Sequence, residues 1–187
     1  MDFLFPYNET KIKPYLKMAV QRIQVHKNKK ATAVKIQKKE VATILAEGKD
    51  EKAKIRAEHI IREDFTIEGL ELLELNLELI HERIKQITTS KECPPDMKEA
   101  VSSVIWAANY VDVPELKDIS SQLTKKFGSK FAEAAQKNEN NEVNIRLSQK
   151  LTYKPPSKLL VRNYLEAIAK VYDVEWKPRE EGLFIHT

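Results

Sequence analysis

The sequence is poor in residues that break helices and lacks long apolar runs. Only four of its 187 residues are glycine and eight are proline. No stretch approaches the roughly 20 consecutive apolar residues that a membrane-spanning helix needs. With 42% hydrophobic and 32% charged residues, the chain is too charged for a membrane protein and too apolar for a disordered one. We therefore predict a folded, all-α protein with a sizeable core.

Cysteine is also scarce, because Cys93 is the only one. A single cysteine cannot form an internal disulfide, which weakly favours a reducing compartment. Residues 1–6 contain no charged region followed by an apolar run, so we expect no secretory signal. These absences predict a cytoplasmic protein.

Acidic residues are missing from a long stretch near the N-terminus. Between Lys11 and Lys39 every charged residue is basic, namely Lys11, Lys13, Lys17, Arg22, Lys27, Lys29, Lys30, Lys35, Lys38 and Lys39. The balance reverses from Glu68 to Glu82, where no Lys or Arg occurs. Such an asymmetry favours an anionic partner for the first stretch, which could be a lipid surface, a nucleic acid or an acidic protein face.

Two long helices are predicted in the first half, over residues 11–46 and 50–88. The first contains no glycine, and Gly48 is a natural C-terminal stop. In the second, residues 73–79 alternate Leu with polar residues, which is typical of a half-buried strand. Leu and Glu are strong helix formers and Glu is depleted in strands, so we predict helix. We expect the two helices to pack as an antiparallel hairpin.

Apolar residues occupy two sides of this second helix. Leu73, Leu77 and Ile80 belong to one stripe, and a second stripe on nearly the opposite side contains Leu72, Leu75 and Leu79. A helix that is apolar on two sides is covered on both. We expect one side to pack on the first helix and the other on the helices that follow.

Shorter helices are predicted in the second half, over residues 95–111, 114–127, 129–138, 142–151 and 158–172. Prolines, Gly128 and a polar loop at residues 138–141 separate them. We predict one domain over residues 1–177 and an irregular tail over residues 178–187.

The sequence contains little that could carry catalysis. Glu78 and His81 form one Glu-x-x-His pair, whereas a di-iron bundle needs two such pairs and two further glutamates. Four glycines could hardly build a phosphate loop, and no neighbour in the sequence would activate Cys93. We predict a protein that is not an enzyme and needs no cofactor or metal, with a di-iron or other enzyme as a remote alternative.

The basic stretch leaves two partners to weigh. Each Lys or Arg near an anionic leaflet contributes about 1 kcal/mol, so several together could hold the protein on a membrane. The alternative is a nucleic-acid-binding helical bundle that uses the same charges. We expect no nucleic acid, because Tyr15 is the only aromatic residue available for stacking in this stretch.

The stretch GKDEKAKIRAEHIIRED at residues 48–64 is the most specific of several characteristic segments. The others are the Glu-rich stretch 71–79 and residues 102–108, 114–119, 143–147, 155–158 and 168–174. Together these segments resemble the increased sodium tolerance family of ESCRT-III-like proteins, over about residues 10–177. The resemblance implies an ESCRT-III-like helical bundle, in which a long two-helix hairpin has shorter helices packed against one end. It also implies an adaptor in multivesicular-body sorting and membrane scission, peripheral on the endosomal membrane.

The resemblance further implies partners. Members bind the C-terminal helix of a charged multivesicular body protein, regulate the AAA ATPase that takes ESCRT-III filaments apart, and in some cases self-assemble. Full-length relatives dock on the ATPase through a terminal Leu-x-x-Arg-Leu-x-x-Leu motif. Residues 143–150 imitate it, but Lys150 stands where a Leu is needed. We therefore predict that residues 142–151 form a packed domain helix, and that any action on the ATPase is indirect.

Two sets of contact residues follow. Lys17, Arg22, Lys29 and Lys30 occupy positions of the kind that support assembly and membrane contact in the family, whereas Asn28 stands where relatives often carry a base. With the neighbouring lysines, the predicted membrane or filament contact is Lys11, Lys13, Lys17, Arg22, Lys29 and Lys30. We expect Lys17 and Arg22 to be exposed, so that their reversal to Glu leaves the fold intact. A groove for the partner helix is predicted at Leu160, Tyr164 and Ile168 against the second helix, with simple core packing as the alternative for each.

Overall fold

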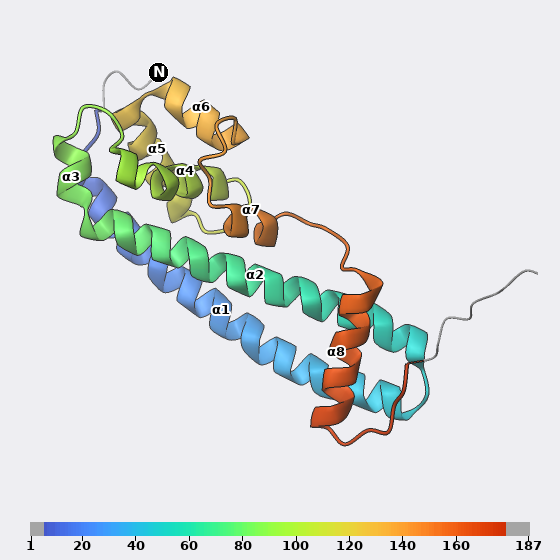
Figure 1. Ribbon diagram of the computed structural model, residues 1–187. Helices are drawn as coiled ribbons and strands as arrows, with labels where there is room; N and C mark the ends of the chain where they lie inside the picture. Colours follow the sequence, from blue (N-terminus) through green and yellow to red (C-terminus); the bar gives the residue numbers. More distant parts are fainter. Residues whose placement is uncertain (1–5, 179–187) are drawn as a thin grey trace, which may run out of the picture. The chain divides into compact units, whose positions relative to one another are not determined.

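The computed structural model describes residues 6–178, and every regular element among them is helical (Figure 1). This confirms the all-α prediction, including helix in place of strand for residues 73–79. Residues 179–187, almost all of the predicted tail, lie outside the described residues. The elements are α1 (Glu9–Ala46), α2 (Asp50–Glu82), α3 (Ile84–Thr89), the 3₁₀ turn η1 (Pro95–Met97), α4 (Lys98–Ala107), α5 (Glu115–Phe127), α6 (Ser129–Lys137), α7 (Ile145–Leu151) and α8 (Lys158–Val171).

The chain forms two compact units, and α1 and α2 each contribute a part to both. The first unit comprises residues 1–29 and 65–153, and the second comprises residues 30–64 and 154–187. Helices α3 to α7 therefore belong to the first unit and α8 to the second. The single domain predicted over residues 1–177 stays a prediction.

In the first unit, α1 and α2 run antiparallel. The Tyr7 hydroxyl, just before α1, lies 2.8 Å from the hydroxyl of Thr88 in α3. Further along, Lys27 of α1 lies 2.7 Å from the carboxylate of Glu74 in α2. Leu73 and Leu77 of the predicted apolar stripe belong to the same buried core cluster as Leu16 and Ile23 of α1. This confirms the predicted antiparallel pairing for the part of the hairpin in this unit.

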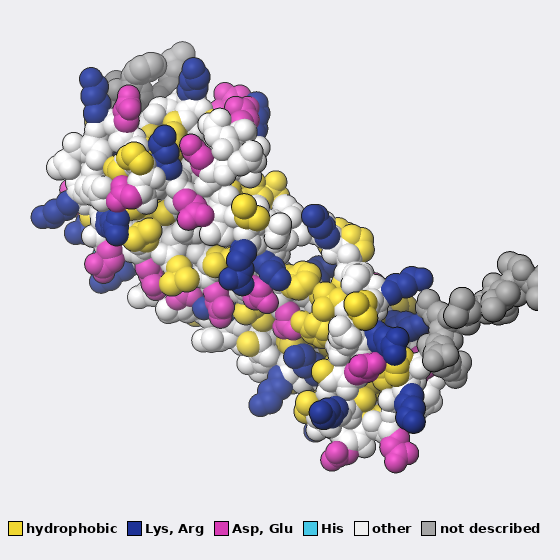
Figure 2. Space-filling model, viewed as in Figure 1, with side chains coloured by type: hydrophobic (Ala, Val, Ile, Leu, Met, Phe, Trp, Pro, Cys, Tyr) yellow, Lys and Arg dark blue, Asp and Glu magenta, His cyan; other side chains and the backbone are white. Residues whose placement is uncertain are grey.

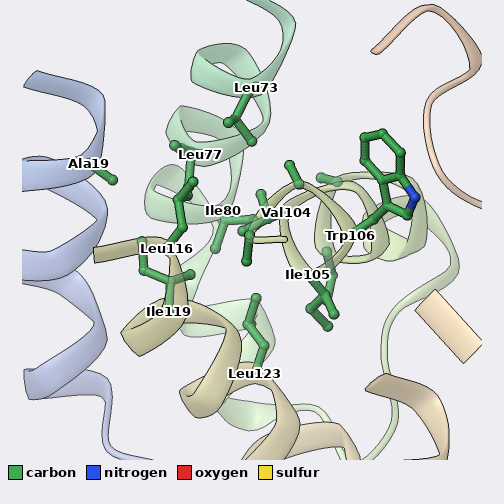
Figure 3. Close-up of a cluster of buried hydrophobic side chains, with 14 of the residues drawn as sticks. Ala19, Leu73, Leu77, Ile80, Val104, Ile105, Trp106, Leu116, Ile119 and Leu123 are labelled. Atoms are coloured by element: carbon green, nitrogen blue, oxygen red, sulfur yellow. The ribbon is translucent and has the colours of Figure 1, made fainter. Parts of the chain in front are cut away.

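The core of the first unit is built around α4 (Figure 3). Residues 100–108 are all buried, and α4 contacts α5, α6 and α7. Small residues such as Ser103 and Ala107 let these neighbours approach closely, and the hydroxyl of Ser103 accepts a hydrogen bond from the backbone N–H of Asn144 at 2.9 Å. The helix ends at Ala107, earlier than predicted, because the N–H of Tyr110 turns back to the Ala107 carbonyl.

Two predictions about α2 need correction. The helix predicted over residues 50–88 is interrupted at Arg83, whose φ of −107° and ψ of 24° depart from helical values. The Arg83 guanidinium donates to Asp96 at 2.8 Å. The second apolar stripe is only partly covered, since Leu72 and Leu79 pack against the core while Leu75 is 61% exposed. The short helices cover too narrow a strip of α2 to reach Leu75.

In the second unit, α8 lies across the adjoining parts of α1 and α2 (Figure 1). Gly48 closes the turn between them with a φ of +74°, which confirms its predicted role. Ser157 caps α8 by accepting a hydrogen bond from the Leu160 N–H at 3.1 Å. Apolar residues of all three helices are buried here, namely Val34, Val41 and Leu45 of α1, Ala53, Ala57 and Ile60 of α2, and Val161, Leu165 and Ile168 of α8.

No helix within residues 6–178 combines the length and the apolar character needed to cross a bilayer.

Candidate membrane and partner interface

The positive charge of α1 is divided between two sides of the helix. On the inner side, Lys27 lies 2.7 Å from the carboxylate of Glu74, which also accepts from the Gln24 amide at 2.8 Å. In the second unit, Lys30 lies 2.8 Å from Glu63. Carboxylates of α2 therefore neutralise part of the basic stretch of α1, and Lys30 is less available for an external partner than predicted.

Four of the predicted contact lysines of α1 are unneutralised. Lys11, Lys13, Lys17 and Lys29 are exposed, and none forms an ion pair with any residue between 6 and 178. In the second unit, Lys35 and Lys39 are exposed in the same way. These side chains are free to meet an anionic surface, which keeps four of the six predicted contact residues available.

Arg22 differs from the other predicted contact residues. Its side chain is 57% exposed, as expected, but its Nε donates to Glu115 at 2.6 Å. The Glu115 side chain is only 8% exposed, and its second oxygen has no hydrogen-bond partner among the described residues. Removing the cation would leave a buried carboxylate uncompensated. The predicted exposure of Arg22 is confirmed, but the ion pair leads us to expect that its reversal to Glu destabilises the fold.

Sequence reasoning missed an apolar component on the outer side of α1. Met18 and Val25 are 40% and 53% exposed, although both are large hydrophobic residues. They lie seven residues apart, on the same face as Lys11 and Lys29. We call Lys11, Met18, Val25 and Lys29 the outer ridge of α1. The seven-residue spacing of Lys11, Met18 and Val25 is the sequence signal that could have revealed this ridge.

The residues predicted to form a partner groove pack within the second unit. Tyr164 donates its hydroxyl to Asp64 at 2.6 Å, and Lys38 lies 5.9 Å from the centre of its ring. Leu160 is half-buried and Ile168 is 4% exposed. The three residues thus hold α8 against α1 and α2, and of the three only Leu160 and Tyr164 present accessible surface.

Other apolar side chains of α8 face outward. Leu159 and Val171 are 65% and 74% exposed. Figure 2 shows hydrophobic side chains gathered at the surface over the start of α8, beside Lys and Arg side chains. The helix is therefore apolar on an exposed side as well as on its packed side.

Within the part of the chain that the structure describes, no three metal-ligating side chains converge on one point. Cys93 is 7% exposed, and burial raises the pKa of its thiol to about 12. Tyr15, the aromatic residue considered for nucleic-acid stacking, is half-buried and packs against the core.

The described residues form an all-helical, ESCRT-III-like domain. It has a basic and an acidic long helix that pair, shorter helices that complete each unit, and exposed lysines along α1. Residues 13–175 match the family model Ist1, described as a regulator of Vps4 activity in the MVB pathway. The chain belongs to this family.

Relatives agree with this assignment. The chain is 36% identical over 170 residues to an IST1-like protein of Dictyostelium discoideum, covering 91% of this chain and 46% of the relative. It is 32% identical over 182 residues to the vacuolar protein sorting-associated protein IST1 of Saccharomyces cerevisiae, covering 92% of this chain and 61% of that protein. The chain thus spans about half to three fifths of the length of these curated relatives.

A solved structure shares the fold. The crystal structure of the S. cerevisiae Ist1 N-terminal domain in complex with the Did2 MIM motif matches with a TM-score of 0.86 and 31% identity. The match covers 96% of this chain and all of that one.

Proposed function

We propose that this chain is an ESCRT-III-associated adaptor of the increased sodium tolerance group, acting in multivesicular-body sorting and membrane scission by binding and not by catalysis. The observation that carries the proposal is the match over nearly the whole chain to an Ist1 N-terminal domain whose crystal structure contains a bound MIM motif. By analogy, the partner of this chain is the C-terminal helix of a charged multivesicular body protein.

The adaptor would influence filaments by binding the partner's C-terminal helix and by contacting the membrane. Capture of the partner's C-terminal helix regulates the assembly of ESCRT-III filaments and their disassembly by the AAA ATPase Vps4. The domain acts on this ATPase indirectly. The exposed, unpaired lysines of α1 hold the domain at an anionic endosomal membrane or against neighbouring filament subunits. These subunits include further copies of this chain, so the domain can also self-assemble. The unpaired state of Lys11, Lys13, Lys17 and Lys29 supports this role.

For the partner helix, we propose a site along α8 that includes Leu160, Tyr164 and Ile168. An amphipathic helix binds by laying its apolar face in an apolar groove. Leu160 is the half-buried, apolar member of the set, so it can contact both the core and a ligand. Leu159, the exposed apolar residue next to it, extends the surface that such a helix could cover.

A pull-down with the partner's C-terminal helix tests this site. The variant Leu160→Glu should lose most of the captured helix, because a carboxylate would lie inside the apolar contact. The variant Val171→Glu, on an exposed side of the same helix, should capture as much as the wild type. Circular dichroism of both variants checks that α8 remains folded. Equal capture by Leu160→Glu and wild type would place the site elsewhere.

A further inference from the structure

A solvent-open groove of about 700 Å³ lies in the first unit, lined by residues from the start of α1 and from the junction of α2 and α3. Its lining is unusually basic for a single small groove, with three lysines, a histidine and one glutamate. The residues are Glu9, Thr10, Lys13, Pro14, Lys17, His81 and Lys85.

The basic side chains come as two pairs with the same spacing. Lys13 and Lys17 are four residues apart on α1, and His81 and Lys85 are four residues apart across the α2–α3 junction. On the unbroken helix α1 this spacing places Lys13 and Lys17 one above the other on one face. His81 and Lys85 stand on either side of the break at Arg83, and both line the groove. Two short rows of N–H donors, one from each side, therefore border the groove.

The charges in the groove are not compensated by the protein. None of Lys13, Lys17 and Lys85 forms an ion pair with a residue in the described part of the chain. Three lysines against Glu9 leave an excess of two positive charges, even with His81 neutral. Like charges four residues apart on a helix destabilise it slightly. On the inner side of α1, by contrast, Lys27 has its own carboxylate.

The arrangement selects for a particular kind of anion. A single carboxylate would satisfy one row of donors and leave the other without an acceptor. A phosphate monoester carries nearly two negative charges and three strong acceptor oxygens, and Lys is a common phosphate ligand. Two phosphates on one small scaffold would place an acceptor group against each row. The groove is within the 300–1,000 Å³ usual for small-molecule sites.

We propose that this groove binds a small ligand with at least two phosphate groups, of the inositol polyphosphate type. Lys13 and Lys17 contact one phosphate, His81 and Lys85 contact the other, and the Thr10 hydroxyl donates a further hydrogen bond. Lys13 and Lys17 belong also to the proposed membrane contact, so the inference deepens that part of the proposed function. His81 and Lys85 are additional to it.

Isothermal titration calorimetry with soluble inositol 1,4,5-trisphosphate tests the site. The wild type should bind saturably at one site, and Lys13→Gln/Lys85→Gln should bind at least tenfold more weakly. The matched control is Lys91→Gln/Lys117→Gln, which removes two exposed charges from the first unit outside the groove and outside the proposed membrane contact. It should bind within twofold of the wild type. Absence of wild-type binding, or equal weakening in both variants, would overturn the proposal.

Vesicles distinguish a lipid headgroup from a free ligand. Wild type and variants are sedimented with phosphatidylinositol bisphosphate vesicles and with phosphatidylserine vesicles of equal charge. If the wild type prefers the phosphoinositide vesicles and Lys13→Gln/Lys85→Gln abolishes this preference, the ligand of the groove is a lipid headgroup. Equal binding to both vesicles, together with saturable binding of the soluble ligand, assigns it to a free polyphosphate.

The same assay separates this inference from the proposed membrane contact. Suppose that Lys17→Glu/Lys29→Glu loses vesicle binding while Lys13→Gln/Lys85→Gln equals the wild type in both arms. The groove would then be rejected and the membrane contact would stand.

Discussion

Arg22 combines an exposed guanidinium with a structural role. Its Nε lies 2.6 Å from Glu115, a carboxylate at the first residue of α5 that is almost completely buried. The helix N-terminus contributes favourable partial charge to this carboxylate, but one of its oxygens has no hydrogen-bond partner among the described residues. Arg22 is therefore the main source of compensating charge for Glu115.

Reversing this charge should destabilise the first unit. Because the pair is half exposed, Arg22→Glu should cost roughly 2 kcal/mol, between the values for exposed and buried ion pairs. For a chain of this length that corresponds to a fall in Tm of roughly 4–8 °C. Thermal unfolding followed by circular dichroism measures it. Lys17→Glu, an exposed and unpaired control on the same helix, should change Tm by about 1 °C at most. Equal Tm values for the two variants would show that Glu115 does not depend on Arg22.

Cys93 should be chemically inert in the folded protein. Burial raises the pKa of its thiol to about 12. Lys98 opposes this rise with the next largest effect, and the carboxylates of Glu142 and Asp96 each add a smaller increase. An Ellman titration at pH 8 should therefore show negligible reaction until urea unfolds the chain. Rapid labelling of the native protein would contradict the burial of this side chain.

The same shift has a consequence for stability. A thiol in the unfolded chain ionises at pH values near 8.5, whereas the folded thiol stays protonated up to about pH 12. The contribution of Cys93 to the stability of the fold is thus fully present below about pH 8.5 and is lost as the pH rises toward 12.

At the scale of elements, α7 docks on α2 through a close approach at Gly69. A Cβ at this position would lie 2.5 Å from the end of the Leu151 side chain. Next to it, Lys150 lies 3.2 Å from Glu68 and 4.1 Å from the centre of the Phe65 ring. Lys150 is thus a docking residue of α7, which agrees with the prediction that residues 142–151 form a packed domain helix.

Gly69→Ala should reveal this packing. In an exposed helix the change would stabilise by about 1 kcal/mol, but here the clash with Leu151 should outweigh that gain and destabilise by roughly 1–2 kcal/mol. Leu151→Ala removes the clashing atoms. The free energy of unfolding of Gly69→Ala/Leu151→Ala should therefore exceed the value expected from the two single changes by about 1 kcal/mol or more. Urea unfolding of the four proteins measures this coupling. Additive effects would mean that α7 does not press on Gly69.

The helices themselves could be predicted because their signals are local. Gly48 and Gly128 end their helices at φ values of +74° and +95°, as their positions in the sequence indicated. The interruption at Arg83 could not be predicted, since it accompanies an ion pair with Asp96, thirteen residues away. The exposure of Leu75 was also hidden, because helical periodicity shows which residues share a face but not whether another helix covers it.

The candidate site was predicted only in part for the same reason. The sequence shows that positive charge gathers on α1, but only the tertiary structure pairs Arg22 with Glu115 and Lys30 with Glu63. These two residues are 93 and 33 positions away from their partners along the chain. Lys11, Lys13, Lys17 and Lys29 are exposed as predicted, and their role in membrane or filament contact stays a prediction.

At the scale of the whole molecule, the outer lysines of α1 should set the affinity for anionic membranes. Reversing Lys17 and Lys29 to Glu removes two contacts of about 1 kcal/mol each and adds repulsion, so binding should fall by at least about 30-fold. Co-sedimentation with phosphatidylserine vesicles at low and high salt measures it, and the wild type should lose affinity as salt rises.

A control with the same change in net charge separates local contact from general attraction. Lys117 and Lys130 are exposed on α5 and α6, and neither is ion-paired within residues 6–178. Lys117→Glu/Lys130→Glu should bind vesicles several times more tightly than Lys17→Glu/Lys29→Glu. Identical losses in the two variants would mean that net charge, and not the surface of α1, governs binding.

The proposed function depends on capture of a partner helix by this chain. The most direct measurement is a fluorescence-anisotropy titration of this chain into a labelled MIM helix from a charged multivesicular body protein. A matched peptide, in which the apolar face of the helix carries Ser, serves as the control. We predict saturable one-to-one binding of the MIM helix and at least tenfold weaker binding of the control. Absence of saturable binding by a domain that is folded by circular dichroism, or equal affinity for both peptides, would contradict the proposed function.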